Sequence, residues 1–162
     1  MKIMDVQVDL ETTPCRVRFT REDGTVGVRH YNGTSQAARA SEAMTSLIAD
    51  EVTLTLREFC EQRWLKYHVS PGLAECTDRN YRCRLENHVL PHLGDMPITE
   101  VTEAAIHEYE RAEIEAGRSY REIGDALRIL SALLGKAEEW CYIDGSPMHK
   151  FDYFSLGTRF AA

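Results

Sequence analysis

Two groups of arginines are the residues whose type and spacing point most directly to chemistry. Arg79, Arg82 and Arg84 lie close together, and Arg121 and Arg128 are spaced so that they share one face of a helix. A guanidinium binds a phosphate through two parallel N–H donors, so arginines on one helix face can contact a nucleic-acid backbone. Acidic residues interleave with these arginines: Asp78, Glu86 and Asp125. The residue pattern alone therefore favours an ordinary solvated face over a phosphate contact.

Expected helix starts beside these arginines add further candidates. Thr77 precedes Arg79, and Ser119 precedes Arg121. A helix N-terminus presents unpaired N–H groups and a partial positive charge, and both favour a phosphate. Ser119 also has an adequate structural role as a helix cap, so its functional role is the weaker interpretation. The full set of candidate DNA contacts is Thr77, Arg79, Arg82, Arg84, Ser119, Tyr120, Arg121, Arg128 and Lys136.

A third group of arginines, Arg16, Arg18 and Arg29, lies in segments of alternating polarity. Because alternate residues of a strand project to the same side, Arg16 and Arg18 share one face, while Val17 and Phe19 take the other. Two interpretations of these arginines stay open. They can form a β-ribbon that reads a DNA groove, or a sheet face that charge keeps soluble.

Other kinds of chemistry lack support in the sequence. His88, His92 and Cys83 have no further ligand at the spacing of a zinc site, so satisfied surface histidines are expected. The five cysteines are odd in number and form no C-x-x-C pair, which fits a reducing cytoplasm rather than a disulfide framework. No nucleotide-binding or metalloprotease motif is present, and no apolar run is long enough to span a membrane. We expect no metal, cofactor, membrane or small-molecule substrate.

The first fifty residues predict a small β-rich module. Alternating residues predict strands at Cys15–Thr20 and Thr25–Tyr31, joined by a turn at Asp23-Gly24. A short helix is expected from Ser41 to Ile48. Two strands and one helix bury little apolar surface, so a third strand or contact with a neighbouring domain is also expected.

The apolar period becomes helical after Thr53. Capping boxes at Thr55–Glu58 and Ser119–Glu122 predict the starts of the first and the longest helix. The first helix is expected to end at Pro71-Gly72, and the second to run from Thr77 to Pro91. The third is expected to start at Thr99 or Thr102 and to end at Gly117, and the longest helix to end before Asp144. Helical stripes place Tyr81, Leu85, Val89, Trp64, Tyr109, Trp140 and Cys141 inward.

The distribution of charge limits the function classes. The net charge is −7, and residues 51–148 hold eleven basic and eighteen acidic residues. A protein that coats nucleic acid without regard to sequence is expected to be basic, because neutralising phosphates supplies most of its affinity. Contact with nucleic acid must therefore come from a local basic face.

An ordered series of motifs runs through the helical part of the chain. Thr77-x3-Tyr81-x3-Leu85 is followed by Val89-Leu-Pro-His-Leu-Gly94 and by Pro97-Ile-Thr-Glu-Val-Thr102. The later positions are Gly117-Arg-Ser119, Ile123, Leu127, Leu130, Ala137, Ile143 and Ser146-Pro147. This series, from about Thr53 to Met148, resembles the core-binding domain of tyrosine recombinases, the phage-integrase family, which usually has Asn-Pro in place of Ser-Pro. The preceding residues resemble the small arm-site-binding module found before this domain in many integrases.

The resemblance implies a mainly α protein in three parts. These are a small N-terminal β-hairpin module at 1–50, a four-to-five-helix SAM-like core-binding bundle at 51–148, and an aromatic tail or linker at 149–162. The bundle would clamp one face of duplex DNA, with Arg82 and Arg121 as the foremost contacts. The family's catalytic domain brings paired arginines, a His-x-x-Arg segment and a nucleophilic tyrosine. Nothing after Pro147 matches those motifs, so no catalytic residue is assigned, and this chain is not expected to cut DNA by itself.

Two hypotheses of function follow. The first is the DNA-binding portion of an integrase-type recombinase that acts in DNA integration and recombination in the cytoplasm, binding duplex DNA weakly and working with other recombinase protomers. The second is a non-catalytic, recombinase-derived module that binds a protein, which the −7 charge favours. Apolar residues in the tail are expected to fold back on the bundle or to pack against a second copy. They are Phe151, Tyr153, Phe154, Leu156 and Phe160.

Overall fold

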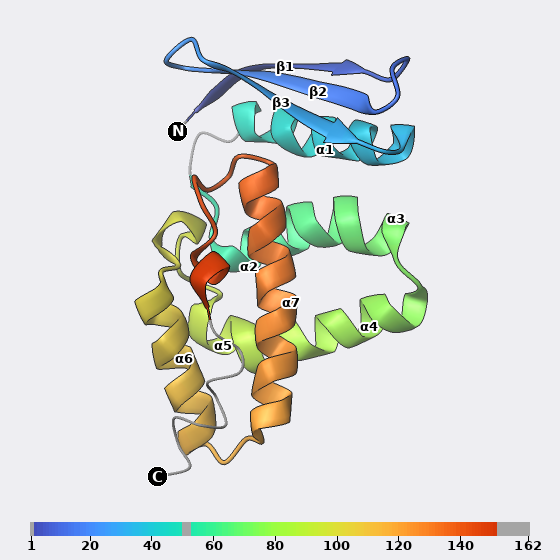
Figure 1. Ribbon diagram of the computed structural model, residues 1–162. Helices are drawn as coiled ribbons and strands as arrows, with labels where there is room; N and C mark the ends of the chain where they lie inside the picture. Colours follow the sequence, from blue (N-terminus) through green and yellow to red (C-terminus); the bar gives the residue numbers. More distant parts are fainter. Residues whose placement is uncertain (1, 50–52, 152–162) are drawn as a thin grey trace.

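A three-stranded antiparallel sheet begins the chain and lies at one end of a set of helices (Figure 1). The computed structural model describes residues 2–49 and 53–151. The strands β1 (Ile3–Asp9), β2 (Cys15–Arg21) and β3 (Val26–Tyr31) follow the order β1-β2-β3, so β2 is central. The expected third strand is thus β1, which pairs with β2.

Helix α1 (Thr34–Ala49) covers one face of the sheet and lies between the sheet and the other helices (Figure 1). Val17 and Phe19 of β2 are buried on that face. The helix faces them with small residues that let its backbone approach closely: Ala37, Ala40 and Ala43. Arg16 and Arg18 project from the opposite, open face, as the period of two predicts.

The expected start of α1 at Ser41 is wrong. The helix begins at Thr34, where the Gly33 carbonyl accepts hydrogen bonds from the N–H groups of Gln36 and Ala37. Ser41 lies in the middle of the helix. The first turns bury alanines, which have the highest helix propensity but too little apolar bulk to give a clear stripe in the sequence.

The first helix of the bundle starts and ends where the sequence predicts. The Thr55 hydroxyl accepts from the Glu58 N–H at 3.2 Å, and the Glu58 carboxylate accepts from the Thr55 N–H at 2.9 Å. The chain runs through α2 (Leu56–Phe59), the π-helical η1 (Cys60–Val69) and α3 (Ser70–Gly72) without a break.

The second helix differs from the prediction at both ends. It runs through α4 (Glu75–Arg84), the π-helical η2 (Leu85–Val89) and α5 (Leu90–Leu93). Thr77 is not its cap, because the first turn forms earlier, with the Thr77 N–H donating to the Ala74 carbonyl at 2.9 Å. Pro91 lies inside the last turn rather than after it. The wider π-helical pairing of the Leu90 N–H with the Leu85 carbonyl precedes this proline, and its missing N–H falls at the start of α5, where none is needed.

The last two long helices have the expected starts. Thr102, rather than Thr99, caps α6 (Glu103–Glu115), which follows the short 3-10 helix η3 (Ile98–Glu100) and ends before Gly117 at a φ of 78°. Ser119 caps α7 (Tyr120–Glu139) in a capping box. Helix α7 ends earlier than predicted, because Trp140 leaves the helical conformation and Cys141 has a φ of 66°. Cys141 is buried, but it lies outside the helix.

Helix α7 crosses α4 and packs at the centre of the helical part (Figure 1). Its inward residues are fully buried: Ile123, Leu127, Leu130, Leu134 and Ala137. Trp64, Tyr109 and Trp140 are also buried, as predicted, and Tyr81 stacks on Trp64 with ring centroids 5.6 Å apart. Within the described residues, no helix has the length and apolar character needed to cross a membrane.

Polar contacts join the sheet unit to the helices. The Tyr142 hydroxyl donates to the Ala43 carbonyl at 3.0 Å and accepts from Arg63 Nε at 2.9 Å. The chain then forms the 3-10 helix η4 (Pro147–Lys150), after which Phe151 is buried with its ring 5.0 Å from that of His107. The tail thus folds back as far as Phe151, and its other four apolar residues lie outside the described ranges.

Two glycines give opposite predictions for stability. A Cβ on Gly27 would overlap the Phe19 ring, so Gly27→Ala is expected to lower the free energy of unfolding by about 1–3 kcal/mol. A Cβ on Gly124 of α7 meets open space, so Gly124→Ala should raise it by about 0.5–1 kcal/mol. Urea unfolding followed by circular dichroism measures both. A Gly27→Ala variant as stable as the parent would contradict the packing of β3 against Phe19.

Candidate nucleic-acid interface

The first two arginines of α4, Arg79 and Arg82, form ion pairs with acids of their own helix. Arg79 pairs with Glu75 at 3.3 Å and is largely exposed. Arg82 pairs with Asp78 and donates from Nη2 to the Ser70 hydroxyl oxygen at 3.0 Å. The hydrogen bond from Arg82 holds the pKa of the Asp78 carboxyl below its usual value. The guanidinium of Arg82 is therefore oriented by α3 and α4 together.

The third arginine of α4 links this helix to α7. Arg84 Nη2 lies 3.5 Å from one oxygen of Asp125, and Arg128 Nη1 lies 3.2 Å from the other. The Arg84 side chain is mostly covered, whereas the Arg128 side chain is 72% exposed. Asp125 thus brings two candidate residues from different helices to one place, and Arg128 is the more accessible of the two.

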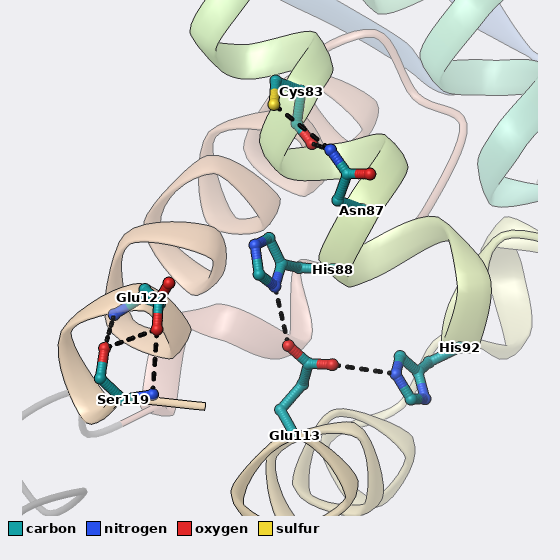
Figure 2. A network of polar contacts seen from close by, with 7 residues as sticks. All are labelled: Cys83, Asn87, His88, His92, Glu113, Ser119 and Glu122. Carbon is teal, nitrogen blue, oxygen red and sulfur yellow. Dashed lines mark hydrogen bonds and ion pairs between the residues drawn. The ribbon is translucent and has the colours of Figure 1, made fainter. Parts of the chain in front are cut away.

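The N-terminus of α7 is already occupied by its own cap. The Glu122 carboxylate accepts from the Ser119 N–H at 3.0 Å and from the Ser119 hydroxyl at 2.7 Å (Figure 2). These hydrogen bonds lower the pKa of Glu122, so a negative charge stays at the helix start. Tyr120 and Arg121 beside it are exposed, and Arg121 forms no ion pair among the described residues. Arg121 is therefore an available cation at this helix end.

Lys136 lies far from the other candidate contacts of α7. It lies fifteen residues after Arg121, about 22 Å along the axis of α7. Its ammonium contacts the Glu139 carboxylate at 2.6 Å, near the junction with the sheet. Thr77, in the first turn of α4, has its own N–H bonded within the helix and so offers only its hydroxyl.

The open face of the sheet gathers a second polar group. The register pairs Arg16 with His30, and it pairs Arg18 with Gln7 on one side and Val28 on the other. These residues line a shallow groove. Neither Arg16 nor Arg18 forms an ion pair in the part of the chain that the structure describes.

Arg29 lies on the opposite face of the sheet. Its guanidinium lies 5.8 Å from the centre of the Phe19 ring, and its Nε donates to the Glu139 carbonyl at 3.5 Å. Arg29 therefore links the sheet to α7. Sequence reasoning did not propose Gln7 and His30 as neighbours of Arg16 and Arg18, because their proximity depends on the strand register.

Polar residues that sequence reasoning did not propose as nucleic-acid contacts also lie along α4. Cys76, Asn80 and Cys83 are exposed. In the turn that follows, the Asn87 amide donates to the Cys83 carbonyl at 2.7 Å (Figure 2). Their spacing of three, four and seven residues, which places them on neighbouring positions of a helix, was the available signal.

The two histidines near Pro91 share one buried carboxylate (Figure 2). Glu113 of α6 reaches His88 Nδ1 at 2.9 Å and His92 Nε2 at 3.2 Å. The histidines are satisfied, as expected, but the His88 side chain is only 12% exposed and is not a surface group. No cluster of three potential metal ligands occurs within residues 2–49 and 53–151. The Glu113 carboxylate instead links α6 to η2 and α5 through these two hydrogen bonds.

Removing this carboxylate should loosen the bundle. Glu113→Gln keeps the shape but replaces an acceptor of two hydrogen bonds, so we expect the free energy of unfolding to fall by about 1–3 kcal/mol. Glu108→Gln, at an exposed position of the same helix, is the matched control and should stay within about 0.5 kcal/mol of the parent. Equal urea midpoints for the two variants would show that the Glu113 contacts add no stability.

Comparisons with known proteins agree on the helical part. Residues 55–111 match the family model described as Phage integrase, N-terminal SAM-like domain. A comparison with curated proteins gave no match. Among solved structures, the solution NMR structure of a phage integrase SAM-like domain from Moorella thermoacetica is similar, with a TM-score of 0.54 and 23% identity over 64% of this chain and 87% of that chain. The helical part therefore has the SAM-like fold, and its residues 55–111 are similar to the phage integrase N-terminal SAM-like domain family.

Proposed function

We propose that the chain is the DNA-binding, core-binding portion of an integrase-type site-specific tyrosine recombinase, acting in DNA integration and recombination in the cytoplasm. The observation that carries this proposal is the family match, which spans α4 and its arginines. Arg84 and Arg128 meet at Asp125 where α4 packs on α7, and with Arg82 of α4 and Arg121 of α7 they would supply cations for the phosphates of duplex DNA. Cutting and joining of DNA belong to the catalytic domain of such a recombinase, and other recombinase protomers are its protein partners.

DNA binding at this crossing would proceed by exchange of partners. Arg82 and Arg128 would turn from Asp78 and Asp125 to phosphate oxygens, while Arg121 has no ion pair to give up among the described residues. An exposed ion pair contributes only about 0–1 kcal/mol, so the exchange costs little. The acids remain close by and repel the DNA. Binding by this chain should therefore be weak, with a Kd of roughly 10⁻⁴–10⁻⁶ M at physiological salt.

The open sheet face supports a second contact. Arg16 and Arg18 lie beside His30 on an antiparallel sheet, and guanidinium groups are the commonest partners of guanine in the major groove. On this proposal residues 1–50 form the small arm-binding-like module, residues 51–148 the core-binding domain and residues 149–162 the tail or linker. Arg29 takes part only indirectly, by holding the sheet to α7.

A protein-interaction module derived from a recombinase is the second candidate function. The observation that favours it is that Arg79, Arg82 and Arg128 all have acidic partners on their own helices, in a chain of net charge −7. Such a surface would attract a partner that presents both signs of charge. This candidate predicts no affinity for DNA, even at low salt.

Replacing two arginines tests the DNA interface. Arg82→Ala with Arg121→Ala should weaken binding to all duplex sequences alike and reduce the salt slope by about one for each phosphate that is no longer neutralised. Fluorescence anisotropy with labelled duplex DNA at several salt concentrations measures both quantities. Arg111→Ala, at an exposed position of α6, removes the same kind of charge away from the crossing and should bind like the parent. Unchanged binding by the double variant would mean that another face contacts DNA. A parent that binds no duplex at any salt concentration would favour the interaction module.

The native cysteines test whether α4 faces the DNA. Cys76 and Cys83 are exposed on α4, whereas Cys15, Cys60 and Cys141 are buried. Burial also raises the pKa of the Cys60 thiol to about 12, so this thiol is unreactive in the folded protein. With saturating duplex DNA, we expect iodoacetamide to alkylate Cys76 and Cys83 several-fold more slowly.

Mass spectrometry of the peptides measures the two rates, and added salt that releases the DNA should restore them. The uncharged reagent avoids repulsion by the DNA itself. Unprotected Cys76 and Cys83 on a protein that anisotropy shows to be saturated with DNA would place α4 outside the interface.

A further inference from the structure

A cavity of about 210 Å³ lies where the sheet unit meets the helical part. Its lining comes from four parts of the chain, with Tyr31 of β3, Arg39 of α1, His68 of η1, and Lys136 and Trp140 of α7 and its C-terminal end among the residues. This volume far exceeds the roughly 30 Å³ that one water molecule takes in the liquid. The cavity lies away from the crossing of α4 and α7 and from the open face of the sheet.

Positive charge gathers in this cavity, although the chain as a whole is acidic. Arg39 is half-buried and forms no ion pair or hydrogen bond among the described residues. Lys136 also lines the cavity and is paired with Glu139, the one acid of the lining. Burial, followed by the nearby charge of Lys136, lowers the pKa of His68, so His68 is a neutral donor or acceptor at pH 7. Arg39 is therefore a cation that has no counterpart in the described part of the protein.

Buried polar atoms without partners concentrate in the same lining. Within the described residues, six buried side-chain atoms lack a hydrogen bond, and three of them belong to residues that line this cavity: Tyr31 Oη, Glu139 Oε1 and Trp140 Nε1. Burial, followed by the nearby Glu139 carboxylate, raises the pKa of the Tyr31 hydroxyl, so these two groups are neighbours in the lining. Buried polar groups are nearly always paired, and an indole N–H can only donate. The free donor of this cavity is the guanidinium of Arg39, which a bound group rich in acceptor oxygens would satisfy.

We propose that this cavity binds a phosphate group, with Arg39 as its main ligand and Lys136 as a second cation. The planar guanidinium donates two parallel hydrogen bonds to two phosphate oxygens, and Lys136 adds a positive charge while it keeps its contact with Glu139. Gln36, one turn before Arg39 on α1, lines the cavity and supplies a neutral amide donor. The site does not depend on the proposed function. The phosphate has two available sources, free inorganic phosphate and the DNA backbone, and the experiment distinguishes them.

A structural role for Arg39 makes a different prediction. Its guanidinium lies near Gly72 at the C-terminal end of α3, where a cation is favoured by the helix dipole. With that role alone, Arg39→Met would lower stability equally with and without phosphate. The two roles are separated by the response to phosphate rather than by stability itself.

The first arm of the experiment titrates the full chain with inorganic phosphate, against sodium chloride at equal ionic strength. We expect a saturable change in tryptophan fluorescence, because Trp140 lines the site, and a melting temperature that rises with the logarithm of phosphate concentration. Arg39→Met should abolish both responses, and Arg39→Lys should retain a weaker one. Arg111→Met, which removes an exposed arginine of α6, should respond like the parent. A response no larger than that to chloride, or an equal response in Arg39→Met, would overturn the proposal.

The second arm titrates the same variants with duplex DNA. If the bound phosphate belongs to the DNA backbone, Arg39→Met should bind DNA more weakly, its salt slope should fall by about one, and inorganic phosphate should compete with DNA. If the site takes free phosphate, Arg39→Met should bind DNA like the parent while it fails in the first arm. A parent that binds phosphate but no DNA would refute the proposed function and leave the site established.

Discussion

The apolar stripe of α7 is the constraint on which the other positions depend. Ile123, Leu127 and Leu130 have no exposed surface, and burying each contributes about 1.5–3 kcal/mol. The helices η1, α4 and α6 all contact α7, so its axis sets where their outer faces lie. One end of α7 carries Arg121 beside the crossing with α4, and the other carries Lys136 and Glu139 at the sheet junction. A single rigid helix thus fixes the distance between the candidate DNA face and the cavity.

Local ion pairs explain how an acidic chain can hold arginines ready for a polyanion. Asp78 orients Arg82, and Asp125 orients both Arg84 and Arg128, each at the surface of the helical part. Ordering a long side chain costs conformational entropy. Because these acids already hold the arginines in place in the free protein, less entropy remains to be lost on binding. The same acids repel an approaching phosphate. The arrangement therefore favours a fixed geometry of the arginines over a high affinity for phosphate.

Local signals made much of the helical part predictable. The capping boxes at Thr55 and Ser119 involve residues three apart, so the sequence alone contains them. Errors arose where wider packing or unusual backbone decided the outcome, as in the alanine-rich start of α1 and the π-helical turn before Pro91. The polar clusters were less predictable from the sequence, because their side chains come from segments that are far apart in the chain. Glu113 meets His88 from another helix, and the lining of the cavity joins β3 and α1 to η1 and α7.

The position of α1 has a consequence for how DNA could be bound. This helix covers the inner face of the sheet and contacts η1, so the open face with Arg16 and Arg18 points away from the helical part (Figure 1). The contacts of Tyr142 with Ala43 and of Arg29 with Glu139 hold that orientation. A straight duplex lying against the crossing of α4 and α7 therefore does not reach the open face of the sheet. If both faces bind DNA, they engage separate segments, and the junction between them sets the angle at which the two segments meet.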